Sequence, residues 1–579
     1  MTKWTGIVAA AAALALAACA TQQSVETAQD RAEQALAASR NFDAKLQAAL
    51  DEQARREQTI MARLADIQTR QDAASAKQSS LSQQLSEVHG ELREQRKTIA
   101  KVTPVRSAPV PGTPAPAPAS LAAPVSSSAA DAMYATVTAR ARQIAAGTTP
   151  APSLAPVPAV LQHLDYGTYE AIGYDGKLAD WSGSDSFKLS FHPAGFVFDQ
   201  SIEVHLLGQK ADAALGFTVD DFHWPGALRD QAPHKVPIAG FRAGQLYDGG
   251  LSAPFLDFLG ASYFQATPVG KPFGLYARAV AIDTGVSNTA EEFPRFSEFW
   301  IGAASGSQLD VVALLTSASI DGAYHFKVLP NVKETAIEVN AALFLTRTVS
   351  QLGLAPLTSM YLQGPDSLNR PDTMAKAVHD SDGLLIHSGQ GWSWIPLFNP
   401  SRLQVVQIPV TDLRGFGLLQ RDRKYDDYQS PQDAYQKHPS AWVEPTNDWG
   451  RGVIKLVEIP AQYPSNNNIV AFWTPANPPA PKQLFRLAYR LDWSIGGPAE
   501  GELGRVLATR IVDLKSGHYA VMIEFGGGSL ANLPGWVKVQ PTVDTNGKDL
   551  KIDKVSLNKI AETGRWRLSF EVSGGGGDE

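Results

Sequence analysis

Phe187-Lys188-Leu189-Ser190-Phe191 alternates apolar and polar side chains, and so, loosely, does Trp566-Arg567-Leu568-Ser569-Phe570-Glu571-Val572 near the other end of the chain. A period of two places every second side chain on the same face of a β-strand. Gly and Pro interrupt the sequence between such runs, and long amphipathic helices are missing there. Because parallel strands require crossover helices, this pattern predicts a mainly β fold of antiparallel sheets packed as sandwiches.

The β-rich body is divided by a polar, proline-rich stretch at 474–483, TPANPPAPKQ. We take this stretch as a domain boundary, with a large domain over 130–475 and a small one, of roughly immunoglobulin size, over 484–579. The chain has 579 residues and is 44 % hydrophobic, so it contains enough apolar material for two folded cores.

Composition excludes several classes of function. The net charge is −7 and only 19 % of the residues are charged, which does not suit binding to nucleic acid. Cys19 is the one cysteine, so no intramolecular disulfide, thiolate zinc cluster or iron–sulfur cluster is possible. The sequence has no Walker loop, dinucleotide fingerprint, HExxH helix or G-x-S-x-G elbow, and we predict neither a metal nor a cofactor.

The N-terminus explains the cysteine. Lys3 is followed by an apolar run too short to span a bilayer and by Leu16-Ala17-Ala18-Cys19, which resembles a bacterial lipobox. The resemblance implies a signal peptide over 1–18, acylation of Cys19 and a periplasmic protein anchored to a membrane by lipid. Ala20, in place of aspartate, favours the outer membrane. The alternative is an ordinary signal peptide in which Cys19 is incidental.

Residues 19–102 are rich in good helix formers and almost free of Gly and Pro from about Val25 onward. Residues at spacings of three and four form a heptad seam, which predicts a helical coiled-coil spacer and permits homo-oligomers. The seam consists of Ile60, Leu64, Ile67, Gln71, Ala74, Gln78, Leu81, Leu85, Val88, Leu92, Gln95, Ile99 and Val102. Residues 103–129 form an Ala- and Pro-rich linker, and a short helical pattern returns over 131–146.

Two aromatic and charged clusters in the body suit carbohydrate. Gly389-Gln390-Gly391-Trp392-Ser393-Trp394 supplies Trp392 and Trp394, and the run 421–428, RDRKYDDY, supplies Arg421, Asp422 and Tyr425. Aromatic rings stack on the C–H faces of a pyranose, and charged planar groups bind its hydroxyls. The alternative is that both tryptophans belong to the core and that the charged run is a solvated hairpin.

Several longer strings, in a fixed order, resemble the periplasmic glucan biosynthesis G/D family from about Asp131 onward. They are Phe258-Leu-Gly-Ala-Ser-Tyr-Phe264, Ala281-Ile-Asp-Thr284, Glu291-Glu-Phe-Pro-Arg-Phe-Ser-Glu-Phe-Trp300, Leu354-Ala-Pro-Leu-Thr-Ser-Met360, Gly415-Phe-Gly-Leu-Leu-Gln-Arg421 and Trp442-Val-Glu-Pro445. The resemblance implies a β-supersandwich with a long cleft, followed by an immunoglobulin-like domain. It also implies a β-glucan partner, largely β-1,2-linked, and some members are similar to inverting β-1,2-glucanases. We add Tyr361 and Trp473 to the expected glucan contacts.

In active relatives the catalytic base lies in a His-Asp-Ser-Asp string, which this chain retains as His379-Asp380-Ser381-Asp382. The resemblance therefore makes Asp380 the candidate base. The alternative is that the string only forms a turn through side-chain to backbone hydrogen bonds, a role that we assign to Asp382.

The acid position differs. Relatives carry an aspartate in an Asp-Asn-Ile-Val string, whereas this chain reads Asn467-Asn468-Ile469-Val470, so Asn467 stands at the acid's place. A carboxamide cannot donate a proton as a carboxylic acid does, and general acid catalysis contributes roughly 10²- to 10⁴-fold in rate.

Two hypotheses follow. In the first, which we favour slightly, the chain is a tethered module that binds or shapes glucan without turnover. In the second, it is an inverting glucanase or transglycosylase in which another carboxyl is the acid, with Asp422, Asp426, Asp448 and Glu458 as candidates. A purely structural spacer of the envelope is a third alternative.

Overall fold

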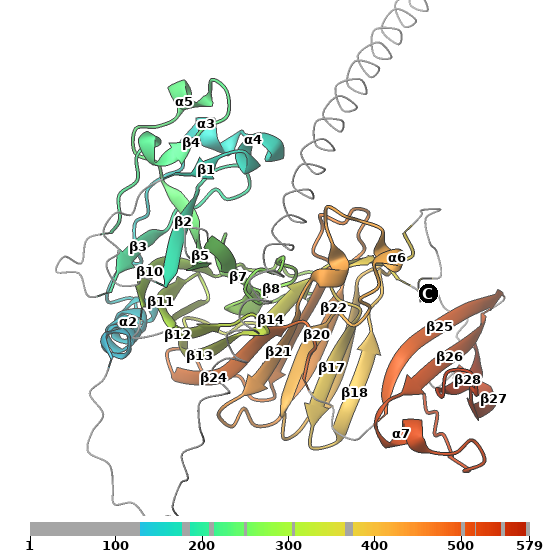
Figure 1. Cartoon of the computed structure of the whole chain (residues 1–579). Helices are drawn as coiled ribbons and strands as arrows, with labels where there is room; N and C mark the ends of the chain where they lie inside the picture. The colour runs from blue at the N-terminus through green and yellow to red at the C-terminus, as the bar shows by residue number, and fades with distance from the viewer. Residues whose placement is uncertain are drawn as a thin grey trace, which may run out of the picture. The chain divides into compact units, whose positions relative to one another are not determined.

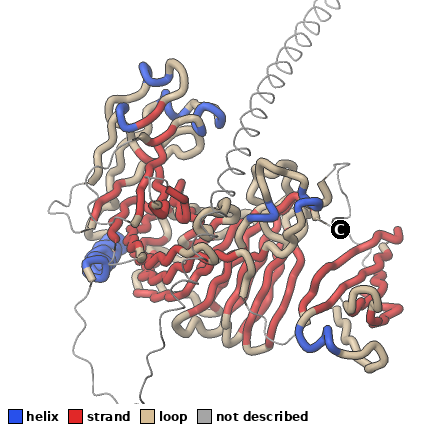
Figure 2. The backbone as a smooth tube through the Cα atoms, viewed as in Figure 1, coloured by secondary structure: helices blue, strands red, loops and turns tan. Residues whose placement is uncertain are grey.

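The computed structural model describes residues 128–175, 186–207, 214–247, 252–303, 307–364, 367, 375–498, 504–515, 517–545 and 550–574. The predicted signal peptide, Cys19, the coiled coil and nearly all of the linker lie outside these residues. Strands dominate the described part (Figure 2), which confirms the prediction of a mainly β fold with antiparallel sheets. None of its helices combines the length and the apolar character needed to cross a membrane.

The first large sheet has ten strands in the order β18-β17-β20-β21-β24-β13-β12-β11-β10-β3 (Figure 1). All neighbours are antiparallel except β3, which runs parallel to β10. The strands are β3 (Glu203–Leu206), β10 (Arg295–Ala303), β11 (Leu309–Thr316), β12 (Ile320–Pro330), β13 (Glu334–Leu345), β17 (Gly383–Ser388), β18 (Gly391–Pro396), β20 (Gly415–Leu419), β21 (Ser440–Pro445) and β24 (Leu484–Ser494).

The second large sheet has the order β19-β22-β23-β14-β8-β7-β6-β5-β2, and β9 also pairs with β14. Its strands are β2 (Phe187–Pro193), β5 (Ile238–Leu246), β6 (Ser252–Leu259), β7 (Tyr263–Ala266), β8 (Tyr276–Arg278), β9 (Val280–Ile282), β14 (Leu352–Ser359), β19 (Gln404–Val410), β22 (Gly452–Glu458) and β23 (Ile469–Pro475). The alternating run at 187–191 therefore opens this sheet as predicted, with Phe187, Leu189 and Phe191 buried.

The two sheets share one hydrophobic core. Phe258 of the second sheet meets Phe326 of the first with ring centroids 5.3 Å apart, and Phe264 meets Trp493 at 5.9 Å. Each sheet consequently has an inner face in this core and an outer face directed away from it, and residues on the two faces alternate along every strand.

Helix α2 (Ala129–Ala145) covers part of the outer face of the first sheet, as Figure 1 shows beside β10 to β13. Ser128 and Asp131 form a capping box at its start, and the helix matches the pattern predicted over 131–146. Val137 and Ala141 are buried against the sheet, and Arg140 binds both carboxylate oxygens of Glu298 at 2.5 and 2.8 Å.

Short elements fill the connections. They are α3 (Ala159–Gln162), α4 (Tyr166–Glu170), β1 (Gly173–Tyr174), the 3₁₀ turn η1 (Val219–Asp221), β4 (Phe222–His223), α5 (Leu228–Gln231), β15 (Tyr361–Gln363), β16 (Val378–His379), α6 (Tyr425–Tyr428) and the 3₁₀ turn η2 (Tyr435–Lys437). β15 pairs with β16, which ends at His379, so this small sheet sets the position of Asp380, the next residue.

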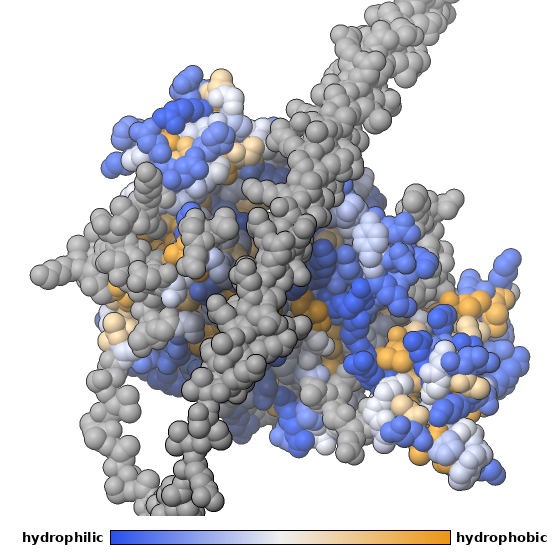
Figure 3. All heavy atoms as spheres, viewed as in Figure 1, coloured by the Kyte–Doolittle hydropathy of each residue, from blue (hydrophilic) through white to orange (hydrophobic). Residues whose placement is uncertain are grey.

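The C-terminal part is one sheet of four strands in the order β25-β26-β28-β27. It contains β25 (Arg505–Lys515), β26 (His518–Gly526), β27 (Leu550–Lys559), β28 (Trp566–Gly574) and the helix α7 (Gly528–Asn532). The described residues of 504–574 contain no second sheet, and the predicted immunoglobulin-like sandwich stays a prediction. Hydrophobic side chains such as Leu514 and Val555 are exposed on these strands, and orange atoms mark this region in Figure 3.

The domain boundary predicted at 474–483 is wrong. β24, which follows it, pairs with β13 along its whole length and with β21 on its other side, in the middle of the first large sheet. The proline-rich stretch is a connection between the two large sheets, because it joins β23 of one to β24 of the other. The chain leaves the large domain only after Ser494.

Candidate functional site

A row of polar side chains crosses the outer face of the second sheet. Strand pairing sets Asp257 opposite both Arg242 and Gln265, and Thr358 opposite Tyr276. The register between β7 and β8 places Gln265 opposite Tyr276 and so closes the row. The neighbouring residues Phe241, Phe258, Phe264 and Ala277 point into the core, so alternation directs the polar row outward.

Asp257 is the fixed negative charge of this row. It is 2 % exposed and bonds to His192 Nε2 at 2.8 Å and to Arg242 Nη2 at 2.6 Å. Burial raises the pKa of Asp257, but the charges and hydrogen bonds of His192 and Arg242 outweigh burial and lower that pKa overall. Asp257 is therefore an ionised acceptor and not a proton donor.

Tyr276 lies near two carboxyl groups, those of Asp257 and Asp380. Burial raises the pKa of Tyr276 to about 12, and the negative charges of Asp257 and Asp380 add to this rise. The exposed side chain of Tyr166, from α4, also faces Tyr276. Asp380 therefore lies near Tyr276, the β8 member of the polar row.

Asp380 forms a pair with His438. Its Oδ1 lies 2.8 Å from His438 Nδ1, and His438 Nε2 lies 2.8 Å from the carbonyl oxygen of Asp433. A carbonyl oxygen only accepts, so Nε2 carries a hydrogen and donates to it. The contact at Nδ1 then needs one more proton, held either by the imidazolium or by the carboxyl group. Asp380 and His438 thus share one hydrogen across this contact.

The rest of the His379–Asp382 string is structural. His379 is fully buried and stacks on Tyr361 with ring centroids 5.2 Å apart, and burial lowers the pKa of His379 to about 3. Asp382 accepts hydrogen bonds from the backbone N–H groups of Arg421 and Asp422, both at 3.1 Å, so it joins two distant segments of the chain rather than closing a local turn. Asp380 is the member of the string that reaches the polar row.

Asn467, at the position of the family's acid, is exposed in the connection between β22 and β23. Its neighbour Asn468 is buried and clamps Tyr361: its Oδ1 accepts from the Tyr361 N–H at 2.8 Å and its Nδ2 donates to the Tyr361 carbonyl at 2.9 Å. Tyr361 is itself only 2 % exposed, so the predicted glucan contact is a packed residue that supports the segment before Asp380.

Trp473 is also a core residue. It is fully buried between the large sheets, with its ring 5.1 Å from that of Trp449. A ligand cannot reach it in this structure, so its assignment as a glucan contact is wrong. Tyr425, by contrast, is 47 % exposed on α6.

The other predicted contacts lie on the first sheet. Trp392 and Trp394 are partly exposed on its outer face, and Trp392 lines a pocket of about 630 Å³. The Arg421 guanidinium lies 4.2 Å from the Trp394 ring centre, and its Nη2 donates to the Val506 carbonyl at 2.5 Å. Neither Asp380 nor any member of the polar row lines this pocket. Of the sequence-predicted contacts, Tyr361 and Trp473 are therefore buried, and the tryptophans on the first sheet lie apart from Asp380.

The four alternative acids differ in their surroundings. Asp426 and Asp448 are exposed, and burial followed by the charge of Asp427 raises the pKa of Asp422. Glu458 is 2 % exposed and accepts from the Phe398 N–H at 2.8 Å, and its burial raises its pKa to about 7. Glu458 alone of the four combines deep burial with a pKa near neutrality.

Sequence reasoning missed Asp257, Gln265, Tyr276 and His438. The signal was present for the first two, because Asp257 and Gln265 flank Phe258–Phe264, a string used for the resemblance. A carboxylate next to a core phenylalanine on a strand must face the opposite side of the sheet. His438 had no such signal, since it lies 58 residues after Asp380.

One group of described side chains has the composition of a metal site. The ligand atoms of Glu203, His205 and Glu298 lie within 4.8 Å of one another. Arg140 binds both oxygens of Glu298, however, and so neutralises the carboxylate that a cation would need. We assign no metal to these residues.

Comparison with known proteins assigns the family. The family model described as "Periplasmic glucan biosynthesis protein, MdoG" matches residues 133–579. The chain is 37 % identical over 456 residues to glucans biosynthesis protein G of Pseudomonas putida strain KT2440, covering 75 % of this chain and 80 % of that protein. It is 38 % identical over 454 residues to the protein of the same name from Ralstonia nicotianae, covering 75 % and 89 %.

A solved structure, the galactosidase domain of an α-galactosidase–sucrose kinase, aligns over 45 % of this chain and 40 % of that chain with a TM-score of 0.24 and 9 % identity. A score so low carries no argument about fold or function. The match of the family model and the two relatives are decisive: this chain belongs to the periplasmic glucan biosynthesis protein family MdoG.

Proposed function

We propose that this protein binds β-1,2-linked glucan in the periplasm during glucan biosynthesis and that the polar row beside Asp380 is its main glucan site. The observation that carries the proposal is the juxtaposition of Asp257, Tyr276 and Asp380 on one outer face, in a chain that belongs to a glucan biosynthesis family.

The chemistry of the row suits a neutral polyhydroxylated chain. The buried Asp257 orients Arg242, and the Arg242 side chain, which is 37 % exposed, donates hydrogen bonds to sugar hydroxyls. Tyr166 and Tyr276 offer aromatic faces for the C–H side of a pyranose. Donors, acceptors and rings on one face are what recognition of a glucan requires.

A second candidate function is hydrolysis or transfer of the glucan, and the Asp380–His438 pair favours it. A pair that holds one mobile proton can act as general acid or as general base. Inversion needs a second group across the bond, and Asp257 cannot donate a proton because His192 and Arg242 keep it ionised. We therefore retain binding or shaping as the favoured role.

One experiment tests both roles. The full chain, purified in detergent, is incubated with linear β-1,2-glucan, and bound glucan and released fragments are measured in the same sample. Binding without fragments supports the module, and fragments released at a rate that Asp380→Asn abolishes support the enzyme. Absence of binding to every β-1,2-glucan tested would contradict the proposed function.

We propose further that Cys19 anchors the protein to a membrane by lipid, with the outer membrane favoured, and that residues 19–102 are a coiled-coil spacer able to form homo-oligomers. Cys19→Ser should remove acylation and move the protein from the membrane fraction to the soluble periplasmic fraction, since no other cysteine exists. A variant that stays in the membrane fraction would refute the lipid anchor. Cross-linking of wild type and of a variant lacking residues 60–102 tests the oligomer.

A further inference from the structure

The bare half of the first sheet's outer face carries tryptophan and glycine side by side. Across five strands, Trp394, Leu385, Gly417, Trp442 and Asp492 lie opposite one another. A second row lies beside the first on the same face. In it Trp392 lies opposite His387, and His387 lies opposite Gly415. Helix α2 covers β10 to β13 of this face, and its hydrophobic cluster reaches β24 at Leu484, at the opposite end of that strand from Asp492.

The glycines let a large ring lie flat against the sheet. A Cβ on Gly415 would lie 2.3 Å from the Trp442 ring, and one on Gly417 would lie 2.9 Å from it. A Cβ on Gly383 would lie 2.0 Å from Trp394 in the same way. Any larger residue at these positions would push the rings away from the strands, so the glycines build a shallow floor lined by tryptophan.

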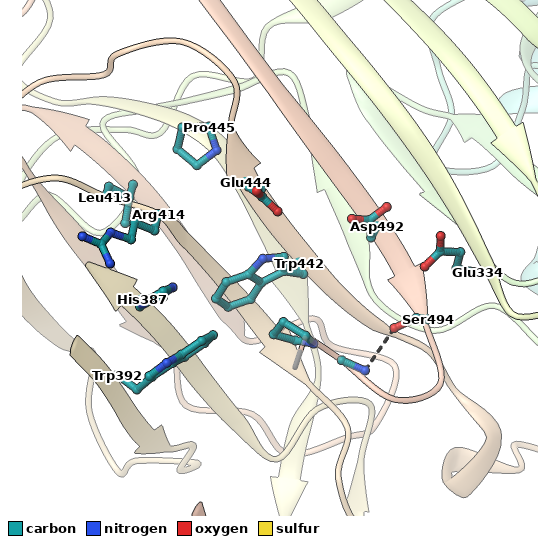
Figure 4. Close-up of a pocket in the computed structure, with 12 residues that line it drawn as sticks. Glu334, His387, Trp392, Leu413, Arg414, Trp442, Glu444, Pro445, Asp492 and Ser494 are labelled. Carbon is teal, nitrogen blue, oxygen red and sulfur yellow. Dashed lines mark hydrogen bonds between the residues drawn. The ribbon is translucent and has the colours of Figure 1, made fainter. Parts of the chain in front are cut away.

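The floor is part of the pocket of about 630 Å³, within the ~300–1,000 Å³ typical of small-molecule sites. Trp392 stacks on His387 with centroids 4.0 Å apart and planes 5° from parallel, and it meets Trp442 at 5.8 Å. Figure 4 shows these rings on one side of the pocket and the carboxylates of Glu444, Asp492 and Glu334 on the other.

The pocket contains both hydrogen-bond acceptors and hydrogen-bond donors. Glu444 is exposed and accepts, and Arg414, whose side chain is 54 % exposed, donates and is paired only with the exposed Asp412 two residues away. Aromatic faces beside solvated acceptors and donors suit a sugar ring better than an apolar or a strongly charged ligand.

We propose that this pocket is a second glucan-binding site, separate from the Asp380 row, that holds a segment of the same β-linked chain. The proposal rests on the proposed function, because it takes the ligand class from it. The residues that line the pocket include no hydrogen-bonded pair like Asp380 and His438. Its role is therefore to retain a long glucan while another segment of the same glucan occupies the Asp380 row. Binding at two places on one chain raises affinity for long glucans above that for short ones.

The test compares variants of the full chain in equilibrium binding to long and to short linear β-1,2-glucan. We expect Trp392→Ala and Arg414→Ala each to weaken binding of the long glucan by about 3- to 10-fold, the range of one lost aromatic or polar contact, and to leave binding of the shortest oligosaccharides to the Asp380 row unchanged. Trp536→Ala is the matched control, since Trp536 is 83 % exposed and does not line this pocket.

The outcomes separate the two proposals. If wild type binds long glucan and Trp392→Ala and Arg414→Ala bind it as well as Trp536→Ala does, the second site is refuted and the proposed function stands. If wild type binds no glucan, the proposed function itself fails, and the second site with it. Arg414→Ala keeps the test valid if Trp392→Ala misfolds, because the Arg414 side chain is 54 % exposed and its loss should cost little stability.

Discussion

The outer faces of the two large sheets differ in how far their charged side chains are buried and paired. On the second sheet, charges are buried and paired: Asp257 with His192 and Arg242, and Asp380 with His438. On the first sheet, one half is covered by α2, and the other half presents tryptophans over glycines beside the exposed Glu444 and the Asp492–Arg490 ion pair. The first arrangement holds charge and protons in place, and the second offers a surface.

The difference indicates a division of work within one protein. Buried, paired carboxyl groups keep defined protonation states and orientations, which chemistry or selective recognition requires. Flat rings with a solvated rim tolerate several positions of a chain, which retention requires. Substitutions that affect one face and spare the other test this division most directly.

Asp380→Asn should have the largest effect. The amide keeps the shape of the side chain and can donate to His438 Nδ1, so the fold should persist, but the exchangeable proton is lost. We expect any glucan turnover to fall by about 10²- to 10⁴-fold and binding of short glucan to weaken by about 10-fold or more. Fragment release and binding in the same sample measure both.

Asp230→Asn is the matched control, since Asp230 is an exposed aspartate on α5. If both variants behave as wild type does, the Asp380 row is not the site. If Asp380→Asn alone loses binding of short glucan and keeps that of long glucan, the two faces are functionally separate.

Arg242→Ala should destabilise the folded state by about 3 kcal/mol, because it leaves the buried Asp257 carboxylate with His192 as its one partner. Arg229→Ala removes an arginine from an exposed pair with Asp220 and should cost less than about 1 kcal/mol. Urea unfolding of both variants measures the difference. Equal losses of stability would mean that the Asp257 network is not the rigid part of the second sheet.

Some of these features were predictable from the sequence. The alternating runs at 187–191 and 566–572 became β2 and β28 because a period of two is a local property of the chain. The boundary at 474–483 was wrong because a proline-rich connection between sheets has the same composition as a domain linker. The partner of β24 is β13, which lies about 140 residues earlier in the chain. No local sequence pattern encodes a pairing over that separation.

Of the residues in the candidate site, only Asp380 was predicted from the sequence. Trp473 follows the Asn467–Val470 string by three residues. Its ring faces the core because Ile469, Ala471 and Trp473 lie on the inner face of β23. Conversely, the polar row is composed of single residues from β5, β6, β7, β8 and β14, which become neighbours only once the sheet forms. Pairing across distant strands carries this information, and residue types alone do not.

Glu458→Gln should change how stability depends on pH. Burial raises the pKa of Glu458 from 4.5 to about 7, so between these values the folded state holds a proton that the unfolded state releases. Stability contributed by this group is therefore lost as the pH rises from 4.5 towards 7. At pH 8 the variant should be more stable than wild type by at most about 3 kcal/mol, and at pH 4 the two should be similar.

Unfolding by urea at pH 4, 6 and 8 checks this dependence, with Glu562→Gln, at an exposed turn residue, as the control. Asp257 gives the opposite sign, because a lowered pKa contributes stability that is present above its ordinary value and lost in acid. If Glu458→Gln gives the same pH dependence as wild type, Glu458 is ionised in the folded state, and its place as a candidate acid is withdrawn.

Ser128→Ala should have the smallest effect and concerns the covered half of the first sheet. Ser128 Oγ accepts from the Asp131 N–H at 3.1 Å, and Asp131 accepts in return from the Ser128 N–H at 3.3 Å, so alanine removes one side of the capping box. We expect a loss of about 1 kcal/mol in unfolding free energy. Because α2 covers β10 to β13 and reaches neither Asp380 nor Trp392, glucan binding at both faces should be unchanged. A Ser128→Ala protein that loses affinity for long glucan at unchanged stability would show that α2 and the tryptophan face act together, and the comparison between a covered and a bare half would have to be abandoned.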